Sequence, residues 1–152
     1  MAAFRFRLEP ILKLKKLRQE QMERKVAQCV GEMLKTRQQL DRLDGQIEQL
    51  YENIRRSGLV GPLQVGNLIG DRRYLNHLHR LRDHQRTLLA KTIHLVDQAK
   101  KGLAEAKKET DIMVKLKEQA HRRFMDERRR KETALLDDLA NAKHAWQRQV
   151  SN

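Results

Sequence analysis

The sequence is poor in the residues that fill a layered globular core. Only 4% of its 152 residues are aromatic and only two are proline, whereas 35% are charged. This composition argues against a compact domain with several layers and favours elongated helices. A single cysteine, Cys29, excludes both an internal disulfide and a cysteine-ligated zinc site. No uncharged run is long enough to cross a bilayer and no apolar signal core follows the basic N-terminus, so we expect a cytoplasmic protein.

Motifs for catalysis are missing as well. The sequence contains no GxxxxGK[ST] phosphate loop, no GxSxG nucleophile elbow and no HExxH zinc motif. No two of its six histidines stand four residues apart, the spacing that places two metal ligands on one face of a helix. We therefore expect no enzymatic activity, no cofactor and no bound metal.

The sequence does contain a strict heptad pattern. Apolar residues recur at alternating steps of four and three, which is typical of a coiled-coil seam rather than of a globular helix face. Charged residues fill the positions between them, so this seam must pack on another helix while the other faces are solvated. The seam positions, of which only Thr36 is polar, are Met22, Val26, Cys29, Met33, Thr36, Leu40, Leu43, Ile47, Leu50 and Ile54.

Glycine and proline divide the chain into two predicted helices. Pro10 suits the first turn of a helix over about residues 10–56, because its missing N–H is not needed there. Residues 57–70 hold four of the seven glycines and predict the turn, with Asp71 as the expected N-cap of a second helix over about residues 71–150. The first helix should add an apolar stripe before its heptads, formed by Ile11, Leu12, Leu14 and Leu17.

The second helix has a less regular predicted seam. Its steps of four and three run as far as Ala99 and then slip by one residue, which predicts a stutter near Gly102. The predicted seam positions are Tyr74, Leu78, Leu81, Gln85, Leu88, Thr92, Leu95, Ala99, Leu103, Ala106, Thr110, Met113, Ala120 and Phe124.

Together these patterns predict an all-α fold in which residues 1–152 form a single helical hairpin. Two long helices pair as an antiparallel coiled coil, with Pro10 opposite roughly Lys117, and the longer second helix overhangs at its C-terminal end. The overhang keeps an apolar stripe without an intramolecular partner, so we expect it to be poorly ordered alone. The stripe consists of Phe124, Leu135, Leu139, Ala142, Trp146 and Val150.

Positive charge is concentrated in parts of the chain. The net charge is +13, and residues 1–18 hold six basic residues against one acidic residue, whereas residues 19–56 hold seven of each. The run Arg128 to Lys131 adds a second basic patch. An acidic protein surface, an anionic lipid or a nucleic acid would each be attracted. Aromatic residues that would stack on bases are nearly absent, so no nucleic-acid role is expected, although a basic coiled coil that binds nucleic acid stays an alternative.

The N-terminal stretch Phe4-Arg5-Phe6-Arg7-Leu8-Glu9-Pro10-Ile11-Leu12-Lys13-Leu14 resembles the opening of FliJ-type flagellar export proteins. Length, basic charge, a two-helix hairpin and an Arg/Lys/Glu-rich segment at residues 122–132 extend this resemblance over the whole chain. The resemblance implies a nonenzymatic component of the flagellar type III export apparatus. Such a protein acts as a stalk or coupling protein between the hexameric export ATPase and the export gate membrane protein, and it assists export chaperones.

The resemblance also implies two partner-facing regions and a place in the cell. The protein would be cytoplasmic, peripheral at the cytoplasmic face of the inner membrane, and associated with the membrane only through its partners. The stalk of a virulence type III secretion system or of a rotary ATPase stays an alternative. The ATPase-facing residues would be Phe4, Phe6, Leu8, Ile11, Lys13, Arg122, Arg123, Arg128, Arg129, Arg130 and Trp146. The gate-facing residues would be Leu43, Ile47, Leu50, Tyr51, Tyr74, Leu81 and His84.

Overall fold

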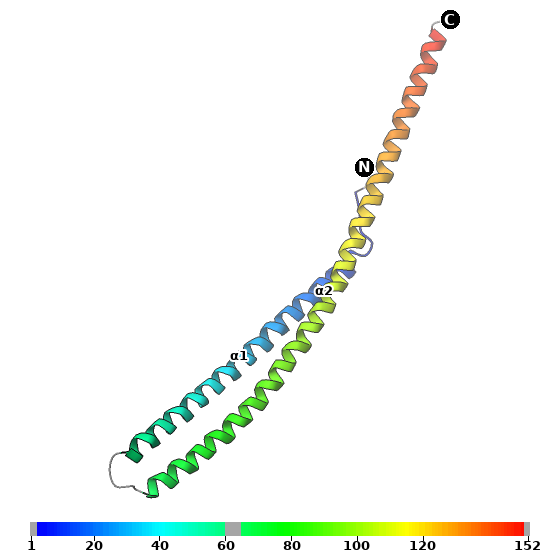
Figure 1. Ribbon diagram of the computed structural model, residues 1–152. Coiled ribbons are helices and arrows are strands. Elements are labelled where there is room, and N and C mark those ends of the chain that lie inside the picture. Colours follow the sequence, from blue (N-terminus) through cyan, green and yellow to red (C-terminus); the bar gives the residue numbers. More distant parts are fainter. Residues whose placement is uncertain (1–2, 60–64, 151–152) are drawn as a thin grey trace. The chain divides into compact units, whose positions relative to one another are not determined.

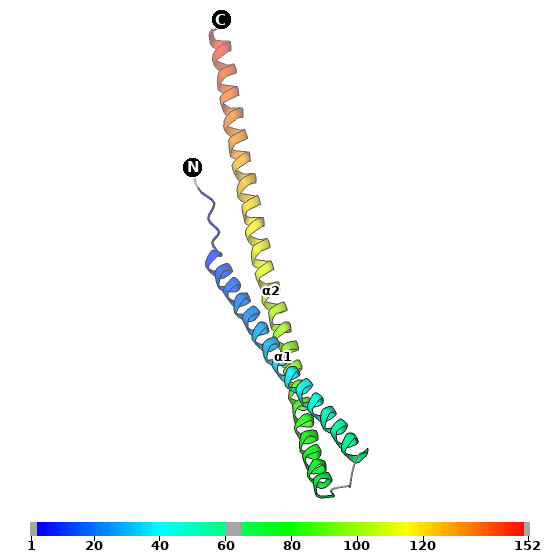
Figure 2. The same ribbon diagram turned by 90° about the vertical axis from the view of Figure 1, so that its left-hand side faces the viewer.

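The computed structural model describes residues 3–59 and 65–150, which form two long helices. Helix α1 spans Glu9–Leu59 and helix α2 spans Val65–Val150 (Figure 1). No strand occurs in these described residues, so the predicted all-α class is confirmed. The cyan section of α1 and the green section of α2 run antiparallel on either side of residues 60–64, as the predicted hairpin requires (Figures 1 and 2).

The chain divides into two compact units, each of which contains a section of both helices. The terminal unit comprises Met1–Arg18 and Ala106–Asn152, and the hairpin unit comprises Gln19–Glu105. The terminal unit also holds the segment that precedes α1.

The start of α1 agrees with the sequence, whereas the predicted turn is too long. Pro10 is the second residue of α1, where no N–H is needed, and the Glu9 amide donates to the Phe6 carbonyl at 3.1 Å. At the other end, α1 continues to Leu59 and α2 begins at Val65, so of the predicted turn only residues 60–64 lie outside the described helices. The predicted N-cap at Asp71 is wrong, because this residue lies inside α2. Glycine costs only about 1 kcal/mol in a helix, which a long helix tolerates.

In the hairpin unit, the predicted seam of α1 is confirmed at every position. All ten predicted seam residues between Met22 and Ile54 are buried or half-buried. Ile47 is only 5% exposed, and Cys29 is half-buried as a small apolar residue of the seam. The steps of four and three therefore predicted the packed face of α1 correctly.

The predicted seam of α2 is wrong at four positions in the same unit. The side chains there are 38–53% exposed, and the buried or half-buried row lies one residue later along the helix. The exposed row, called the outer row below, is Tyr74, Leu81, Leu88 and Leu95. The observed seam is Leu75, Leu78, Arg82, Gln85, Leu89, Thr92, Val96, Ala99 and Leu103.

The corrected seam also removes the predicted stutter. The step of four from Ala99 to Leu103 is the regular step after the step of three from Val96. In the terminal unit, α2 keeps the same alternation through Ala106, Thr110, Met113, Lys117, Ala120 and Phe124, all of which are buried or half-buried. Gly102 therefore does not interrupt the heptad pattern of α2.

Arg82 explains why the sequence pointed to the wrong row. A charged residue occupies this seam position, whereas its neighbour Leu81 is apolar but 41% exposed. The Arg82 side chain is only 23% exposed, because its aliphatic stem can lie along apolar surface while the guanidinium reaches the edge of the seam. Its Nε is buried without a hydrogen-bond acceptor and makes only a long, 3.8 Å ion pair with Asp83.

Buried threonines satisfy their hydroxyl groups within their own helix. Thr36 donates to the carbonyl of Glu32 at 2.9 Å, and Thr110 donates to the carbonyl of Ala106 at 3.0 Å. Thr92 donates in the same way to the carbonyl of Leu89. These hydroxyls can therefore be buried in the seam without an unpaired polar group.

The N-terminal apolar stripe of α1 does not face the seam as a whole. Leu12 is buried at 2% exposure, but Ile11, Leu14 and Leu17 are 43%, 65% and 50% exposed. Within the terminal unit, the seam instead passes through Leu8, Leu12 and Lys15. Of the four residues of the predicted apolar stripe, only Leu12 therefore packs in the seam.

The last part of α2 is helical and exposed. The helix continues to Val150, and every side chain from Asp126 to Gln147 is exposed. The helical form of this segment is thus described, whereas the predicted overhang beyond α1 and its order in the free protein stay predictions.

Candidate partner-binding surfaces

The segment before α1 alternates between buried and exposed side chains. Phe4, Phe6 and Leu8 are half-buried, whereas Arg5 and Arg7 between them are exposed. The alternation runs from an irregular stretch into the turn at residues 7 and 8, which the hydrogen bond from the Glu9 amide to the Phe6 carbonyl closes. One side of this segment is therefore apolar and lies against α2, and the other is cationic.

Phe4 holds this segment on α2. Its ring packs edge-on against the ring of His121, with centroids 5.0 Å apart and an interplanar angle of 88°. The Phe124 ring lies 5.6 Å away at a tilted angle. Aromatic pairs prefer such edge and tilted arrangements, which add to the gain from apolar burial. The N-terminal segment thus covers one face of α2 in the terminal unit.

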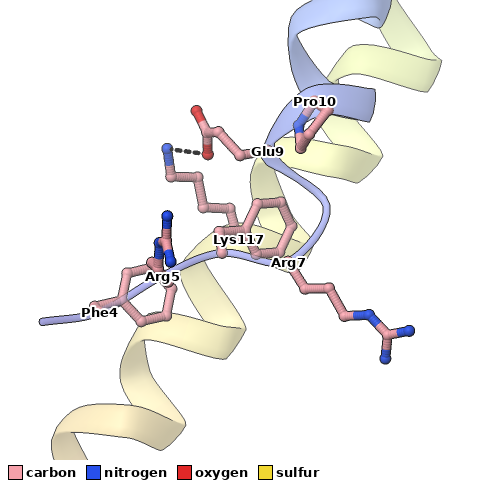
Figure 3. Close-up of a pocket in the computed structure, with 7 residues that line it drawn as sticks. Phe4, Arg5, Arg7, Glu9, Pro10 and Lys117 are labelled. Carbon is pink, nitrogen blue, oxygen red and sulfur yellow. Dashed lines mark ion pairs between the residues drawn. The ribbon is translucent and has the colours of Figure 1, made fainter. Parts of the chain in front are cut away.

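An ion pair fastens the start of α1 to the same part of α2. Lys117 Nζ lies 2.7 Å from Glu9 Oε2 (Figure 3). This pairing confirms the predicted register, in which Pro10 lies opposite roughly Lys117. The hydrogen bond from Lys117 lowers the pKa of Glu9 below its ordinary value, and the charges of Lys117, Lys13 and Lys16 act in the same direction. A groove of about 680 Å³ borders the pair and is lined by Phe4, Arg5, Phe6, Arg7, Glu9, Pro10 and Lys117.

A second ionic cluster joins the helices of the terminal unit. Lys15 Nζ lies 2.8 Å from Glu109 Oε2, and Arg18 Nη1 approaches the same oxygen at 3.4 Å. The hydrogen bond from Lys15 lowers the pKa of Glu109, and the charges of Lys15 and Arg18 lower it further. Lys15 thus occupies a seam position of the kind that leucine or isoleucine occupies elsewhere in α1, and its charge is paired with Glu109.

The residues expected to face an ATPase all lie in the terminal unit. Phe4, Phe6 and Leu8 are half-buried, and Ile11 and Lys13 are exposed. On α2 the basic residues of the set are all exposed, and Trp146 is 69% exposed. The basic residues are Arg122, Arg123, Arg128, Arg129 and Arg130.

The residues expected to face a gate lie in the hairpin unit and fall into two groups. Leu43, Ile47 and Leu50 belong to the seam and are buried or half-buried against α2. Tyr51, Tyr74, Leu81 and His84 are exposed. The second group therefore offers most of the side-chain surface that another molecule could contact.

Tyr51 belongs to a polar groove at the edge of the hairpin unit. Its hydroxyl shares a hydrogen bond of 3.2 Å with His79 Nε2, which ties α1 to α2. The groove has a volume of about 590 Å³ and combines three carboxylates with two guanidinium groups; its lining residues are Asp44, Ile47, Glu48, Tyr51, Glu52, Arg55 and Arg82.

Four large apolar side chains of the terminal unit are exposed although the sequence pattern did not indicate it. Leu14 and Leu17 were assigned to an apolar stripe of the first helix, and Ile112 and Leu116 were given no role; these four side chains are 41–65% exposed. Extending the heptads of α1 backwards from Met22 would have placed Lys15, rather than Leu14 or Leu17, in the seam.

Charge differs between the units in the same direction as the sequence suggested. The terminal unit carries eighteen basic and nine acidic residues, and the hairpin unit carries fifteen and eleven. A strongly acidic partner would therefore be attracted mainly to the terminal unit.

Two further observations concern residues 3–59 and 65–150. No stretch of helix in this part of the chain is long and apolar enough to cross a membrane. Over the same residues, no group of three or more His, Cys, Asp or Glu side chains could hold a metal ion.

Comparisons with known proteins match almost the full length of the chain. A family model described as "Flagellar FliJ protein" matches residues 4–150. The solved structure of a YscO homolog from Chlamydia trachomatis has a TM-score of 0.55 and 18% sequence identity, with 97% of this chain and 99% of that chain covered. The two chains therefore share a fold. A search of curated proteins finds no match.

Proposed function

Because the chain belongs to the flagellar FliJ family and so to the type III export apparatus, we propose that it is a nonenzymatic stalk or coupling protein. It connects the export ATPase ring with the export gate and assists export chaperones. The match over residues 4–150 supports this proposal more than any other observation, because it includes both helices and the segment before α1. The protein works in the cytoplasm and reaches the inner membrane only through its partners.

The terminal unit is the ATPase-facing part in this proposal. Its excess of basic over acidic residues would attract an acidic surface, and its exposed apolar residues would supply contact area. Ile11 at 43% and Trp146 at 69% exposure are suited to such contacts, whereas Phe4 is already half-buried on α2. The exposed arginines mainly speed association, and the apolar residues mainly slow dissociation.

The hairpin unit carries the gate-facing part. Tyr51, Tyr74, Leu81 and His84 make the contacts, because they are the exposed members of the expected set. Leu43, Ile47 and Leu50 act indirectly by holding the two helices together. Exposed tyrosine supports this assignment, since aromatic residues are enriched at protein interfaces.

Two sets of variants tested against two partners examine this proposal. Charge reversal of Arg128, Arg129 and Arg130 to glutamate should weaken binding to the purified export ATPase about tenfold or more at low salt, mainly by slowing association. The same variant should bind the cytoplasmic part of the gate protein with unchanged affinity. Tyr74→Ser with Leu81→Ser should show the opposite pattern.

Surface binding measurements with each partner provide the test. Reversal of Arg72 and Arg73, which are exposed on the hairpin unit, is the control for the effect of lost positive charge. Equal losses for both variants with both partners would contradict the division of roles between the two units. Failure of the wild-type chain to bind either partner would contradict the function itself.

A further inference from the structure

The end of the hairpin unit next to the chain reversal differs in charge from the rest of the unit. This hairpin end comprises residues 53–59 and 65–73, which hold four arginines and one acidic residue, Asp71. The other described residues of the unit, 19–52 and 74–105, hold eleven basic and ten acidic residues. Most of the unit's excess positive charge is therefore gathered at one end. The four arginines are Arg55, Arg56, Arg72 and Arg73.

These arginines lie close to the ends of both helices. Arg55 and Arg56 belong to the last five residues of α1, and Arg72 and Arg73 belong to the first nine residues of α2. Both helix ends lie at the chain reversal (Figures 1 and 2). At about 1.5 Å per residue, each arginine is within about 12 Å of the end of its helix, close to the Debye length of about 8–10 Å over which a charge acts in salt solution. A charged surface that faces the hairpin end would therefore attract all four.

The four guanidinium groups are exposed and are spread around the hairpin end. Among the described residues, only Arg56 of the four has an ion pair, with Glu52 at 3.0 Å. Each pair of arginines consists of neighbours in sequence, and neighbours on an α-helix project about 100° apart, so the two members of a pair do not face the same way. A protein partner would cover one side of the hairpin, whereas a flat anionic surface can meet the whole end.

An exposed apolar side chain lies between the two arginines of α2. Ile69 is 51% exposed and stands three and four residues before Arg72 and Arg73, so one guanidinium lies on either side of it on the helix surface. Surfaces that combine basic and apolar side chains bind at the boundary between lipid headgroups and acyl chains. Guanidinium groups also form paired hydrogen bonds with phosphate. The hairpin end thus matches an anionic phospholipid surface in charge and in polarity.

We propose that the hairpin end contacts anionic phospholipids of the membrane surface directly. The proposal rests on the proposed function for how the chain reaches the membrane, and it adds a lipid contact to the contact with the gate protein. Each arginine near an anionic surface strengthens binding about fivefold, so four give an association constant of the order of 10³ M⁻¹. A single myristoyl chain, at about 10⁴ M⁻¹, attaches only marginally. Partners therefore still bring the chain to the membrane, and the hairpin end orients it there.

Tryptophan fluorescence at the hairpin end tests this contact in the full-length chain. Trp146 is the single tryptophan and lies in the terminal unit, so Ile69→Trp with Trp146→Phe moves the fluorescent probe to the hairpin end. Vesicles of phosphatidylglycerol and phosphatidylcholine that contain brominated lipid should quench the introduced tryptophan at about 0.1 M salt, and much less at about 0.5 M salt. Brominated vesicles of phosphatidylcholine alone should not quench it.

Two pairs of charge reversals in this probe-carrying chain locate the contact. Arg72→Glu with Arg73→Glu should raise the lipid concentration for half-maximal quenching at least about tenfold. Arg80→Glu with Arg86→Glu changes the charge equally at exposed positions more than about 20 Å from the start of α2, and should raise that concentration less than about twofold. Arg72→Lys with Arg73→Lys should keep most of the binding, because the charge is kept. Circular dichroism should show the same thermal unfolding for all of them, because these side chains are exposed.

The outcomes separate the lipid contact from its alternatives. Equal effects of the two glutamate pairs, or no quenching by the anionic vesicles, would overturn the proposal. Quenching of Trp146 in the wild-type chain without quenching at position 69 would assign lipid binding to the basic terminal unit and overturn it as well. So would an Arg72→Glu and Arg73→Glu variant that loses affinity for the cytoplasmic part of the gate protein but shows no response to lipid, since an acidic protein surface would then be the occupant.

The same experiment keeps the proposal distinct from the function on which it rests. The vesicles contain neither the ATPase nor the gate protein. A wild-type chain that binds neither partner would therefore refute the proposed function alone, whatever the vesicles show.

Discussion

The hairpin unit and the terminal unit join sections of the same two helices with different chemistry. In the hairpin unit, the seam of α1 is apolar except at Gln19 and Thr36, and the positions with less than 10% exposure include Ile47, Leu78 and Val96. In the terminal unit, Lys15 and Lys117 occupy seam positions and pair with glutamates, while Leu14 and Ile112 face water. The units thus differ in their seams, which are mainly apolar in the hairpin unit and contain ion pairs in the terminal unit, whereas both expose apolar side chains, the outer row in one and Leu14 and Ile112 in the other.

This difference has an energetic meaning. Apolar burial stabilises by roughly 25 cal/mol per Å², whereas exposed ion pairs contribute little and are screened by salt. The hairpin unit should therefore supply most of the stability of the free protein. The terminal unit should unfold more easily and gain most from a partner that covers its outward leucines and isoleucines.

The largest expected effect comes from two neighbouring residues of α2. Val96→Asp should destabilise the protein by several kcal/mol, because Val96 is 5% exposed and a carboxylate there would be buried without a partner. Leu95→Asp should cost less than about 1 kcal/mol, because Leu95 is 47% exposed. Thermal and urea unfolding followed by circular dichroism compare the two. A larger loss of stability for Leu95→Asp than for Val96→Asp would mean that the outer row is the packed row, as the sequence predicted, and would reject the seam through Val96.

A gain is expected where the hairpin unit departs from its own pattern. Arg82→Leu should stabilise the protein by about 1 kcal/mol, because it removes a buried Nε that has no acceptor and completes the apolar seam. Arg80→Leu, two residues away on the exposed surface, is the control and should have little effect. Urea unfolding measures both. A clear loss for Arg82→Leu would mean that the guanidinium makes a favourable interaction in the groove near Tyr51.

A smaller effect is expected from the ionic cluster of the terminal unit. Glu109→Gln removes the negative charge that pairs with Lys15 and Arg18, so the terminal unit should lose a little protection in hydrogen exchange at low salt. At about 1 M salt the difference from wild type should vanish, because screening already weakens the pairs. If Glu109→Gln still lowers hydrogen-exchange protection at high salt, packing rather than charge is responsible for the difference from wild type.

The smallest effect concerns acidic pH. Folding lowers the pKa values of Glu9 and Glu109, so their contribution to stability is fully present above the unfolded value of about 4.3 and is lost as pH falls through the lower folded values. Between about pH 5 and pH 3 the wild type should therefore lose slightly more stability than Glu9→Gln with Glu109→Gln. Unfolding curves across this range test the sign. A steeper loss in the double variant would contradict it.

Much of this architecture follows from periodicity. The seam of α1 was predicted at all ten positions, because apolar residues from Met22 to Ile54 leave one phase only. The pairing of the start of α1 with Lys117 followed from counting residues along two antiparallel helices. Both inferences depend on geometry that every α-helix shares.

The errors have equally specific causes. On α2, two apolar rows lie side by side, and Arg82 interrupts the row that is packed, so the sequence favoured the outer row. Around the connection, glycines were taken to end the helices, although Gly66 and Gly70 lie within α2 and have open space where a Cβ would stand. Contacts of Phe4 with His121 and Phe124 join segments far apart in sequence, so no local pattern could reveal them.

The seam threonines donate their hydroxyl hydrogen bonds within their own helices. They therefore do little to determine which residues of α1 pair with which residues of α2. A seam that repeats every seven residues looks nearly the same after a slip of one heptad, or about 10.5 Å, so apolar packing alone would tolerate the shifted pairing. Interactions that do not repeat remove this translational symmetry. Glu9 with Lys117 and Lys15 with Glu109 do so in the terminal unit, and Gln39 with Gln85 and Tyr51 with His79 do so in the hairpin unit. These polar pairs contribute little to stability. They favour the observed register of the two helices over registers that are shifted by one heptad.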